Sequence, residues 1–433
     1  MIFNQFCFLV SLWACSTTPI VALSSGAARL DAPQPPLEVD CAIIGGGPAG
    51  LAAAIAISKS SPSSSIAIFE RDQFQPKGAS IQISKPGWES IAQLDPALLD
   101  KLKETSVPVT AVELKPFDSP KSSKPKKSFA NISIQVVSFI FRLLRRAVTH
   151  THLWHDVRMV LADQAKHLYS YSEGTPSDLI YTNCSLKRIK VLNDDVQDDN
   201  ANDGQHGSRF ELVLDANNHE RTVKAKFLFA CDGTKSRTRS LLPKEPDILL
   251  AENKSVWRGT ARNISTFGKA TFYKDDENGG RSALIFPAGR DAGSSWTVIS
   301  EAEDGKSETD QEARDRVLSI VKDCDEILKR AIDDSPIIIE NKLQVRNFDL
   351  PWGSAYDGLI FIGDSAHPVR PTGEGTALAF EDARVLGEMI AEHGLSVKVL
   401  RAYEDERYEP VKIISEKVRA SAQGFYKNSK KTV

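Results

Sequence analysis

Apolar residues occur along the chain in short runs, and the runs alternate between the spacing of a strand and that of a helix. The segment Glu38–Ile44 is mostly apolar and ends in glycines, which predicts a buried parallel strand. The Ala-rich segment Pro48–Ser60 has no helix breaker after its first turn, so it predicts a helix with proline at its start. The run Ser65–Glu70 predicts a second strand. A strand, a glycine turn, a helix and a strand in this order form the βαβ unit that binds dinucleotides.

The middle of the chain has a residue pattern that is typical of antiparallel sheets. Three β-rich runs within 179–230 predict an antiparallel meander. The acidic stretch 194–208 between the first two runs is poor in apolar residues and predicts a disordered surface loop. The remaining elements are expected as strands within Trp257–Ser300, one amphipathic helix over Glu308–Asp333, a buried strand over Asp357–Ile362, and helices over Phe380–His393 and Val397–Gln423.

An unusual insertion precedes the meander. Lys115–Lys127 is a basic loop rich in Lys, Pro and Ser, and Ile132–Val148 is strongly apolar but carries three arginines. One interpretation is a basic amphipathic element that makes a peripheral membrane contact through residues 132–148. The other, which we favour, is a strand and a helix that cover a substrate pocket while the arginines reach water.

The first 28 residues contain no charged side chain. Their apolar run, Ile2–Cys15, is short for a membrane span, and small residues follow it, so the segment resembles a secretory signal peptide that lacks a basic start. We therefore expect a signal or targeting peptide and a location in an endomembrane lumen or an organelle. A buried or disordered N-terminus is the alternative.

Composition adds limits on function. The 433 residues are 41% hydrophobic and 26% charged, which is ordinary for a globular protein with two domains or one large α/β unit bearing an inserted lobe. The net charge of -3 gives no reason to expect a nucleic-acid partner. The six cysteines show no CxxC pair and no metal-ligand spacing, so we expect neither a metal site nor a disulfide framework.

The glycine turn after the first strand is the first candidate for chemistry. In Gly45-x-Gly47-x-x-Gly50, the first glycine permits a tight turn, the second lets a pyrophosphate approach, and the third lets the helix pack closely. Glu70 ends the second strand, where a carboxylate accepts hydrogen bonds from a ribose diol. The helix start offers free N–H groups and a positive dipole end to phosphates. We expect the phosphate-binding residues to be Gly45, Gly47, Pro48, Ala49 and Gly50.

Two further apolar strands end in a Gly/Asp pair. One ends at Asp232-Gly233 and is followed by Ser236 and Arg239. The other ends at Gly363-Asp364, and after a proline turn Gly373-x-Gly375 opens a helix. Strand ends of this kind, far apart in sequence, suggest that several sheet edges converge on one elongated ligand. For Asp232 and Arg239 a structural helix cap with a surface salt bridge is the alternative.

Together the three motifs resemble the group A flavoprotein monooxygenases, the single-component FAD-dependent hydroxylases with the para-hydroxybenzoate hydroxylase fold. The family pattern is GxGxxG with an acidic residue after the second strand, then DGxxSxxR, then GDxAHxxxPxxGxG, and all three parts occur here in that order. Segments 77–94 and 155–165 also resemble the family. The likeness as a whole extends from Val39 to about Met389.

The resemblance implies an α/β fold: an FAD-binding Rossmann-like domain of the GR2 type with an inserted antiparallel-sheet substrate domain. Both domains are expected to be discontinuous in sequence. The expected boundaries are 1–28 for the targeting peptide, 38–80, 150–245 and 355–395 for the FAD-binding domain, 81–149 and 246–354 for the substrate domain, and 396–427 for a C-terminal helix.

The resemblance also implies roles for single residues. Glu70, helped by Arg71, would hold the adenosine ribose, and Arg158 would contact the phosphate–ribityl region of the flavin. Asp364 would contact the ribityl–pyrophosphate region, and Asp232 belongs to the segment associated with both FAD and nicotinamide. His367 is interpreted as a structural residue satisfied by backbone groups.

The helix that opens after the proline turn would direct its N-terminus at the pyrimidine edge of the flavin, where its dipole stabilises the anionic reduced form. Its expected contact residues are Gly373, Gly375, Thr376 and Ala377. Two departures from the family pattern occur. Ala377 stands where the family often has Asn, and Lys85-Pro86-Gly87 replaces the usual Pro-Asn.

The implied function is that of an FAD-dependent monooxygenase. NAD(P)H would reduce the FAD, and a flavin C4a-hydroperoxide formed with O₂ would insert one oxygen atom into an aromatic or unsaturated small molecule. No catalytic acid or base is assigned. The alternatives are an FAD-dependent reductase or epoxidase of an isoprenoid-type substrate, and a non-catalytic flavin-binding interaction protein. Substrate contacts are expected from segment 81–149 and from Trp257, Phe272, Tyr273, Phe286 and Trp296.

Overall fold

The structure is a computed structural model. It describes residues 35–76, 79–117, 150–169, 178–192, 207, 209–275, 280–290, 292–301 and 309–427. The targeting peptide expected over 1–28, the membrane or lid element expected over 132–148 and almost all of the acidic loop therefore lie outside the described residues. Among the residues that are described, no helix is both long enough and apolar enough to cross a membrane.

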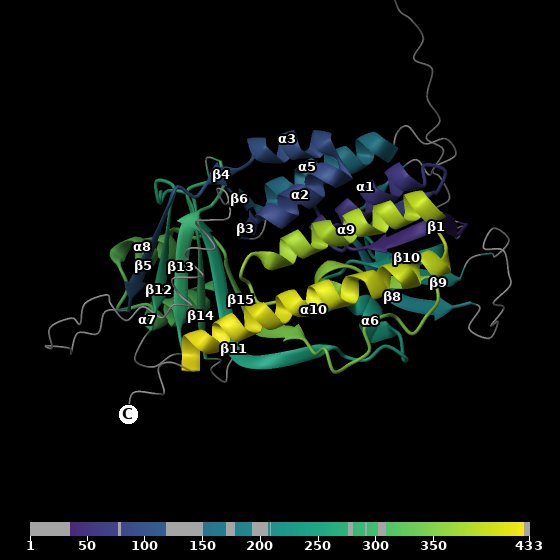
Figure 1. Cartoon of the computed structure of the whole chain (residues 1–433). Coiled ribbons are helices and arrows are strands. Elements are labelled where there is room, and N and C mark those ends of the chain that lie inside the picture. The colour runs from purple at the N-terminus through teal and green to yellow at the C-terminus, as the bar shows by residue number, and fades with distance from the viewer. Residues whose placement is uncertain are drawn as a thin grey trace, which may run out of the picture. The chain divides into compact units, whose positions relative to one another are not determined.

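A seven-stranded sheet contains the expected βαβ unit (Figure 1). Its strands are, in spatial order, β7 (Ile180–Tyr181), β2 (Ile66–Phe69), β1 (Leu37–Ile44), β10 (His219–Ala230), β9 (Phe210–Ala216) and β8 (Cys184–Val191), with β16 (Leu359–Phe361) also paired to β10. The expected meander is present as β8, β9 and β10. Beyond the meander, however, β10 continues as a parallel strand between β1 and β16.

Both faces of this sheet are buried, which explains the continuous apolar runs of its parallel strands. In β1, Cys41 and Ile43 face one hydrophobic cluster, and Ala42 and Ile44 face another. The first cluster includes helices α1 (Pro48–Ser60), α2 (Lys85–Leu94), α3 (Pro96–Glu104), α5 (Trp154–Tyr169), α9 (Glu374–His393) and α10 (Val397–Lys427). Helices α5 and α9 each pack against α1, and α10 packs against α9.

A six-stranded sheet forms the second part of the fold. Its spatial order is β15 (Ile338–Arg346), β11 (Leu249–Ala261), β14 (Ser294–Glu301), β13 (Ser282–Pro287), β12 (Lys269–Lys274) and β5 (Ala111–Pro116). The strands expected within Trp257–Ser300 are confirmed. All neighbours are antiparallel except β12 and β5. The domain boundaries given above stay a prediction.

The single helix expected over Glu308–Asp333 is wrong. The structure has two helices there, α7 (Asp310–Ile320) and α8 (Glu326–Asp334). Val321 and Cys324 are both buried under the six-stranded sheet, and the Cys324 N–H donates to the Val321 carbonyl at 2.9 Å. Helix α7 thus ends in a tight turn, and a new helix, α8, begins after it.

Three short strands and two short helices complete the described elements. The strands β3 (Ser80–Ile83), β6 (His150–Leu153) and β4 (Val107–Pro108) form a small sheet in that order. The helices are α6 (Arg237–Leu241) and the 3-10 turn η2 (Gly363–Ser365), which follow β10 and β16. Both short helices therefore begin at the strand ends where the sequence places its Gly/Asp pairs.

Candidate nucleotide-binding site

The ends of β1, β10 and β16 meet at one edge of the seven-stranded sheet. Ile44 pairs with Ala230, and Ala230 pairs with Phe361, so the three sequence motifs begin side by side. A Cβ atom at Gly45 would clash with the carbonyl oxygen of Cys231, and one at Gly363 would lie 2.9 Å from the Ala49 Cβ. The structure thus brings together the three motifs that lie far apart in sequence.

The glycine turn has the geometry of a phosphate cradle. Gly45 has a φ of +106°, a conformation that favours glycine, and a Cβ at Gly50 would clash with the Gly45 carbonyl. At Gly47 the nearest atom to such a Cβ is a ring carbon of Trp154 at 3.9 Å, so the backbone can be approached there. Helix α1 begins at Pro48 with no side-chain cap and no acidic residue in its first turn. Its first N–H groups therefore remain available to an anion.

Glu70 and Arg158 form a mostly buried ion pair beside this turn, with 2.9 Å between Nη2 and Oε2. The Gly46 N–H donates to the same Glu70 oxygen at 2.9 Å, and the Asp72 N–H donates to the other at 2.9 Å. An ionised carboxylate offers about four lone-pair positions, and these donors use three. One position on Oε1 remains for a ribose hydroxyl.

Arg158 lies at the Glu70 end of the turn. Its Nε donates to the Gly46 carbonyl at 2.7 Å, and its guanidinium stacks 3.6 Å from the centre of the Phe74 ring. Burial lowers the pKa of Arg158, and the Glu70 carboxylate opposes this effect. Arg71 does not join this group, because its side chain is 78% exposed and lies 3.7 Å from Asp72.

The second motif contains a helix cap and a buried crosslink. Asp232 Oδ2 accepts hydrogen bonds from the N–H and the hydroxyl of Thr238, at 2.8 and 2.9 Å, while its Oδ1 is buried and has no partner among the described residues. Arg239 is buried and donates to Glu245 at 3.0 Å and to the Ser365 carbonyl at 3.1 Å. The surface salt bridge considered for Arg239 is therefore wrong, since this side chain ties the second motif to the third from inside.

Asp364 lies in the turn η2, directly after β16. Its side chain reaches solvent, but protein surrounds much of it. These surroundings raise the pKa of Asp364, and the positive charges of His367 and Arg258 oppose this rise. The Thr234 hydroxyl donates to its Oδ2 at 3.5 Å, and a Cβ at Gly375 would lie 3.5 Å from its Oδ1. Asp364 therefore stands where the second motif and the start of α9 approach each other.

The turn that carries Asp364 is held from behind by a buried carboxylate that sequence reasoning missed. Asp382 accepts hydrogen bonds from the Gly363 N–H at 2.9 Å and from Arg407 Nε at 2.8 Å. It also forms a hydrogen bond with His367 Nε2 at 2.6 Å. Burial alone would raise the pKa of Asp382, but His367 and Arg407 lower it to about 2. His367 is structural as expected, although a carboxylate and not backbone satisfies its Nε2.

The start of α9 is uncapped. Gly373 precedes the helix with a φ of +90°, no side chain caps it, and a Cβ there would lie 3.2 Å from Gln82 Oε1. The N–H groups of Gly375, Thr376 and Ala377 lie in the first turn, where helical partners are missing. An electron-rich edge of a ligand would be stabilised at this position.

Three of the five aromatic residues expected to contact substrate are in the core. Trp257, Tyr273 and Trp296 are at most 2% exposed and pack in the hydrophobic cluster with α7 and α8. That expectation is wrong for these three because side chains alternate along a strand. Phe272 and Phe286 point to the other face of the sheet and are half-buried.

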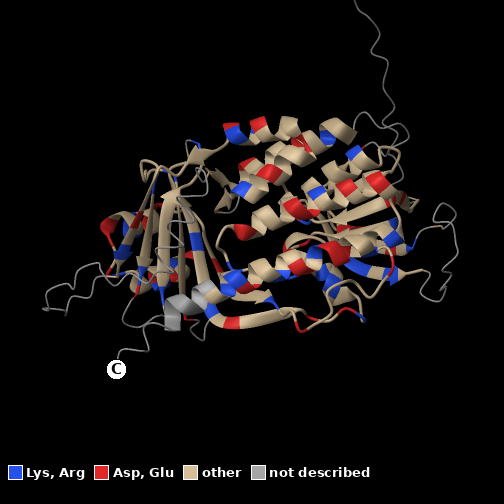
Figure 2. Ribbon diagram, viewed as in Figure 1, with Lys and Arg blue, Asp and Glu red and all other residues tan. Residues whose placement is uncertain are grey.

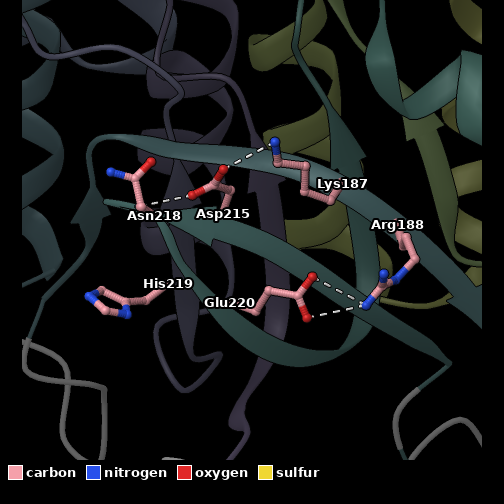
Figure 3. Close-up of a pocket in the computed structure, with 6 residues that line it drawn as sticks. All are labelled: Lys187, Arg188, Asp215, Asn218, His219 and Glu220. Atoms are coloured by element: carbon pink, nitrogen blue, oxygen red, sulfur yellow. Dashed lines mark hydrogen bonds and ion pairs between the residues drawn. The ribbon is translucent and has the colours of Figure 1, made fainter. Parts of the chain in front are cut away.

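One surface pocket lies away from these motifs (Figure 3). It is lined by Lys187, Arg188, Asp215, Asn218, His219 and Glu220. Lys187 pairs with Asp215 at 3.1 Å and Arg188 with Glu220 at 3.3 Å, so these charges are already matched. His219 begins β10, whereas the motifs follow its end, so the pocket lies at the opposite end of that strand.

Comparisons with known proteins agree with this geometry. The FAD binding domain family matches residues 194–417, more than half of the chain. Salicyloyl-CoA 5-hydroxylase of Streptomyces sp is 24% identical over 403 residues, which are 89% of this chain and 64% of that protein. The chain thus spans less than two thirds of the length of this relative.

Solved structures share the fold. HpxO of Klebsiella pneumoniae, solved with FAD and uric acid, has a TM-score of 0.65 at 17% identity and covers 89% of each chain. PqsL of P. aeruginosa, solved with 2-aminobenzoylacetate, has a TM-score of 0.61 at 16% identity and covers 90% of this chain and 97% of that one. Both likenesses concern the fold.

The location expected from the N-terminal leader is wrong. The relatives just described are proteins of Streptomyces, Klebsiella and P. aeruginosa. These are bacteria, whose cells have no endomembrane lumen, so the fold and its cofactor site do not depend on such a compartment.

The expected FAD cofactor and fold class are confirmed. The family match covers the second and third motifs, and the glycine cradle, the uncapped helix ends and the unpartnered Asp232 oxygen fit a dinucleotide. The family match identifies residues 194–417 as an FAD binding domain. The chain belongs to the FAD binding domain family and has the para-hydroxybenzoate hydroxylase-like fold.

Proposed function

We propose that the chain is a monooxygenase that hydroxylates an aromatic or unsaturated small molecule, with NAD(P)H and O₂ as co-substrates. The observation that carries this proposal is the convergence of three motifs and an uncapped helix at one edge of the seven-stranded sheet, beside Asp364. The compounds named with the relatives are salicyloyl-CoA, uric acid and 2-aminobenzoylacetate, and these conjugated ring compounds support the substrate class.

The residues fit specific parts of FAD. The turn Gly45–Gly50 would hold the pyrophosphate, and the free position on Glu70 Oε1 would accept a ribose hydroxyl. Arg158 would act on the adenosine side by fixing Glu70, and its contact with the phosphate–ribityl region of the flavin stays a prediction. Asp232 Oδ1 and Asp364 would serve the middle of the cofactor, and the first turn of α9 would face the flavin edge.

When bound, FAD would accept a hydride from NAD(P)H and would activate O₂. The chain supplies electrostatics and exclusion of water. The positive end of α9 and its unpaired N–H groups would stabilise negative charge on the ligand that they face. The face of the six-stranded sheet that bears Phe272 and Phe286 would cover the bound flavin and would limit the access of water to the reacting atoms.

The test uses FAD-loaded full-length chain mixed with NADPH or NADH in air. Nicotinamide oxidation, peroxide release and new oxygenated products are measured over a panel of aromatic and isoprenoid compounds. We expect slow oxidation that some aromatic compounds accelerate, with one oxygen atom from ¹⁸O₂ in the product. Bound FAD that neither nicotinamide reduces would favour the non-catalytic flavin protein, and accelerated oxidation without oxygen incorporation would favour the reductase.

A further inference from the structure

The proline turn in front of α9, residues 366–372, is tied to the six-stranded sheet by an ion pair. Arg370 in this turn pairs with Glu252 of β11, and each of the two side chains is only 12% exposed. A second tie comes from Arg346 at the end of β15, whose N–H donates to the Pro368 carbonyl at 2.9 Å and whose Nη1 donates to the Ala366 carbonyl at 2.6 Å. Two neighbouring strands of the sheet therefore hold the segment that leads into α9.

Glu252 lies in an irregular part of β11. Ala251 is paired with Gln344 of β15, and Ser255 is paired with Lys342, so three residues of β11 lie opposite one residue of β15. Such a bulge bends the strand and changes the direction in which a side chain points, and bulges are common next to functional sites. The bulge thus takes Glu252 out of the regular ladder, and its carboxylate reaches the proline turn.

The ion pair has little access to water, so solvent and salt screen it weakly. Among the charged groups nearby, Lys254 interacts electrostatically with both Glu252 and Arg370, and its ammonium donates to the Gly280 carbonyl at 2.7 Å. Removal of one partner from such a pair leaves the other as a nearly buried charge, which must move toward water or find a new partner. Loss of either side chain would therefore release the proline turn from β11, while the bonds of Arg346 to the turn remain.

The position of this turn determines where α9 begins. Only Pro371 and Thr372 separate Arg370 from Gly373, the residue before the helix, and the Thr372 N–H donates to the Arg370 carbonyl at 2.7 Å. The first N–H groups of α9 have no helical partners and form the positive end of the helix dipole, whose effect falls off within one turn of helix. A small displacement of the turn therefore changes the field at the ligand that this helix end faces.

We propose that Glu252 and Arg370 are a positioning pair that fixes the start of α9 and thereby sets the reduction potential of the bound FAD. The pair acts through the helix end and not through a net charge of its own, because its two charges cancel. The inference rests on the proposed function, in which the first turn of α9 faces the flavin edge. It gives the six-stranded sheet a second role, because this sheet then controls the cofactor from outside the glycine cradle.

The test measures the midpoint potential of FAD in the full chain by reductive titration without nicotinamide and without O₂. The variants are Glu252→Gln, Arg370→Met, Arg370→Lys and the exchanged pair that combines Glu252→Arg with Arg370→Glu. The control Glu113→Gln breaks a half-exposed pair with Lys269 at the opposite edge of the same sheet. The dissociation constant of oxidised FAD and the thermal unfolding temperature are measured for every variant.

Glu252→Gln and Arg370→Met should both lower the midpoint potential, because each releases the turn and weakens the stabilisation of the reduced flavin. Affinity for reduced relative to oxidised FAD should fall about three- to thirtyfold, the range of a helix-end effect, which lowers a two-electron potential by about 15–45 mV. The exchanged pair should return toward the wild-type potential, and Glu113→Gln should keep it. Arg370→Lys retains the charge and should lose less than Arg370→Met, a comparison that decides if a Glu252 variant does not fold.

The sign of the shifts separates this role from two others. A direct effect of the charges would raise the potential in Glu252→Gln and lower it in Arg370→Met. A merely structural pair would lower the unfolding temperature of both variants and leave the potential of wild type. Either result would overturn the proposal.

Nicotinamide oxidation and oxygen incorporation are followed in the same samples, so that the two proposals can fail separately. Their absence from a wild type whose variants show the expected shifts counts against the proposed function and not against the pair. Oxygen incorporation by a wild type whose potential is unchanged in the variants counts against the pair alone.

Discussion

Ala377 of α9 and Gly87 of α2 lie against each other. A Cβ at Gly87 would be 3.1 Å from both the Cα and the Cβ of Ala377. These are the two positions at which the chain departs from the group A pattern, so the departures form one contact. A small residue on each side lets α2 reach the first turn of α9, and each small residue makes the other necessary.

Replacing Ala377 by the Asn that the family often has should therefore destabilise this chain. Ala377 is 5% exposed, and the added atoms would meet the backbone of α2. Overpacking of this kind lowers the free energy of unfolding by about 1–3 kcal/mol, which denaturant unfolding of the apoprotein can measure. The control Ala420→Asn, on an exposed position of α10, should cost only about 0.5 kcal/mol in helix propensity. Equal effects in the two variants would show that the contact with Gly87 is unimportant.

Gly45→Ala should abolish FAD binding, and Gly394→Ala should not. Both glycines have positive φ, +106° and +79°, so each alanine adds about 1–2 kcal/mol of backbone strain. Only at Gly45 does the new Cβ also meet another chain segment, the Cys231 carbonyl at the end of β10. The flavin content of the purified variants and their FAD dissociation constants check this, and retention of FAD by Gly45→Ala would contradict the assigned cradle.

Glu70→Gln should weaken both the fold and the cofactor site. It leaves Arg158, whose side chain is 4% exposed, without its charged partner. Breaking a buried ion pair costs about 3–5 kcal/mol, and the solvent access of Glu70 places the expected loss near the lower end, about 3 kcal/mol. Thermal unfolding with and without FAD measures both effects. Glu220→Gln, which breaks an exposed pair, is the control and should change stability little.

The buried Asp382 should make stability fall in acid. Its pKa is about 2 in the folded chain and 3.8 in the absence of these interactions, so the stabilisation is complete above about pH 4 and is lost as the pH falls toward 2. The difference corresponds to about 2 kcal/mol. Urea unfolding of wild type between pH 5 and 2.5 should show this loss, and Asp382→Asn should lack it. The exposed Asp349→Asn, as control, should keep the wild-type slope.

The residues explain which parts of the fold could be predicted from the sequence. The strand, helix and glycine turn of Leu37–Ser60 were predictable because their apolar runs and φ requirements are local. The two later motifs were found because each follows a buried strand. The partner of the third motif, Arg407, lies 43 residues beyond Asp364 on an ordinary charged helix, α10 (Figure 2), and nothing local marks it as buried.

Other predictions failed because burial depends on tertiary contacts. The turn between α7 and α8 contains neither Gly nor Pro, and the buried residues on both sides of it keep the spacing of one continuous helix, so nothing local marks the break. Likewise Trp257 and Arg258 are neighbours in one strand, and only the sheet decides which of them faces the core. Sequence spacing identified that strand but not the orientation of its faces.

The position of β10 between β1 and β16 has a consequence for how the chain is made. During synthesis, β1 and β9 can pair with β10 once residue 230 has been made, but the end of β10 at Leu228–Ala230 keeps one edge open until β16 follows more than a hundred residues later. An unpaired edge strand is a point at which chains associate wrongly. Arg407, which holds the turn after β16 through Asp382, is synthesised later still. A ribosome-bound or truncated chain that ends before α10 therefore lacks the arginine that holds Asp382, and with it part of the support of the turn that carries Asp364.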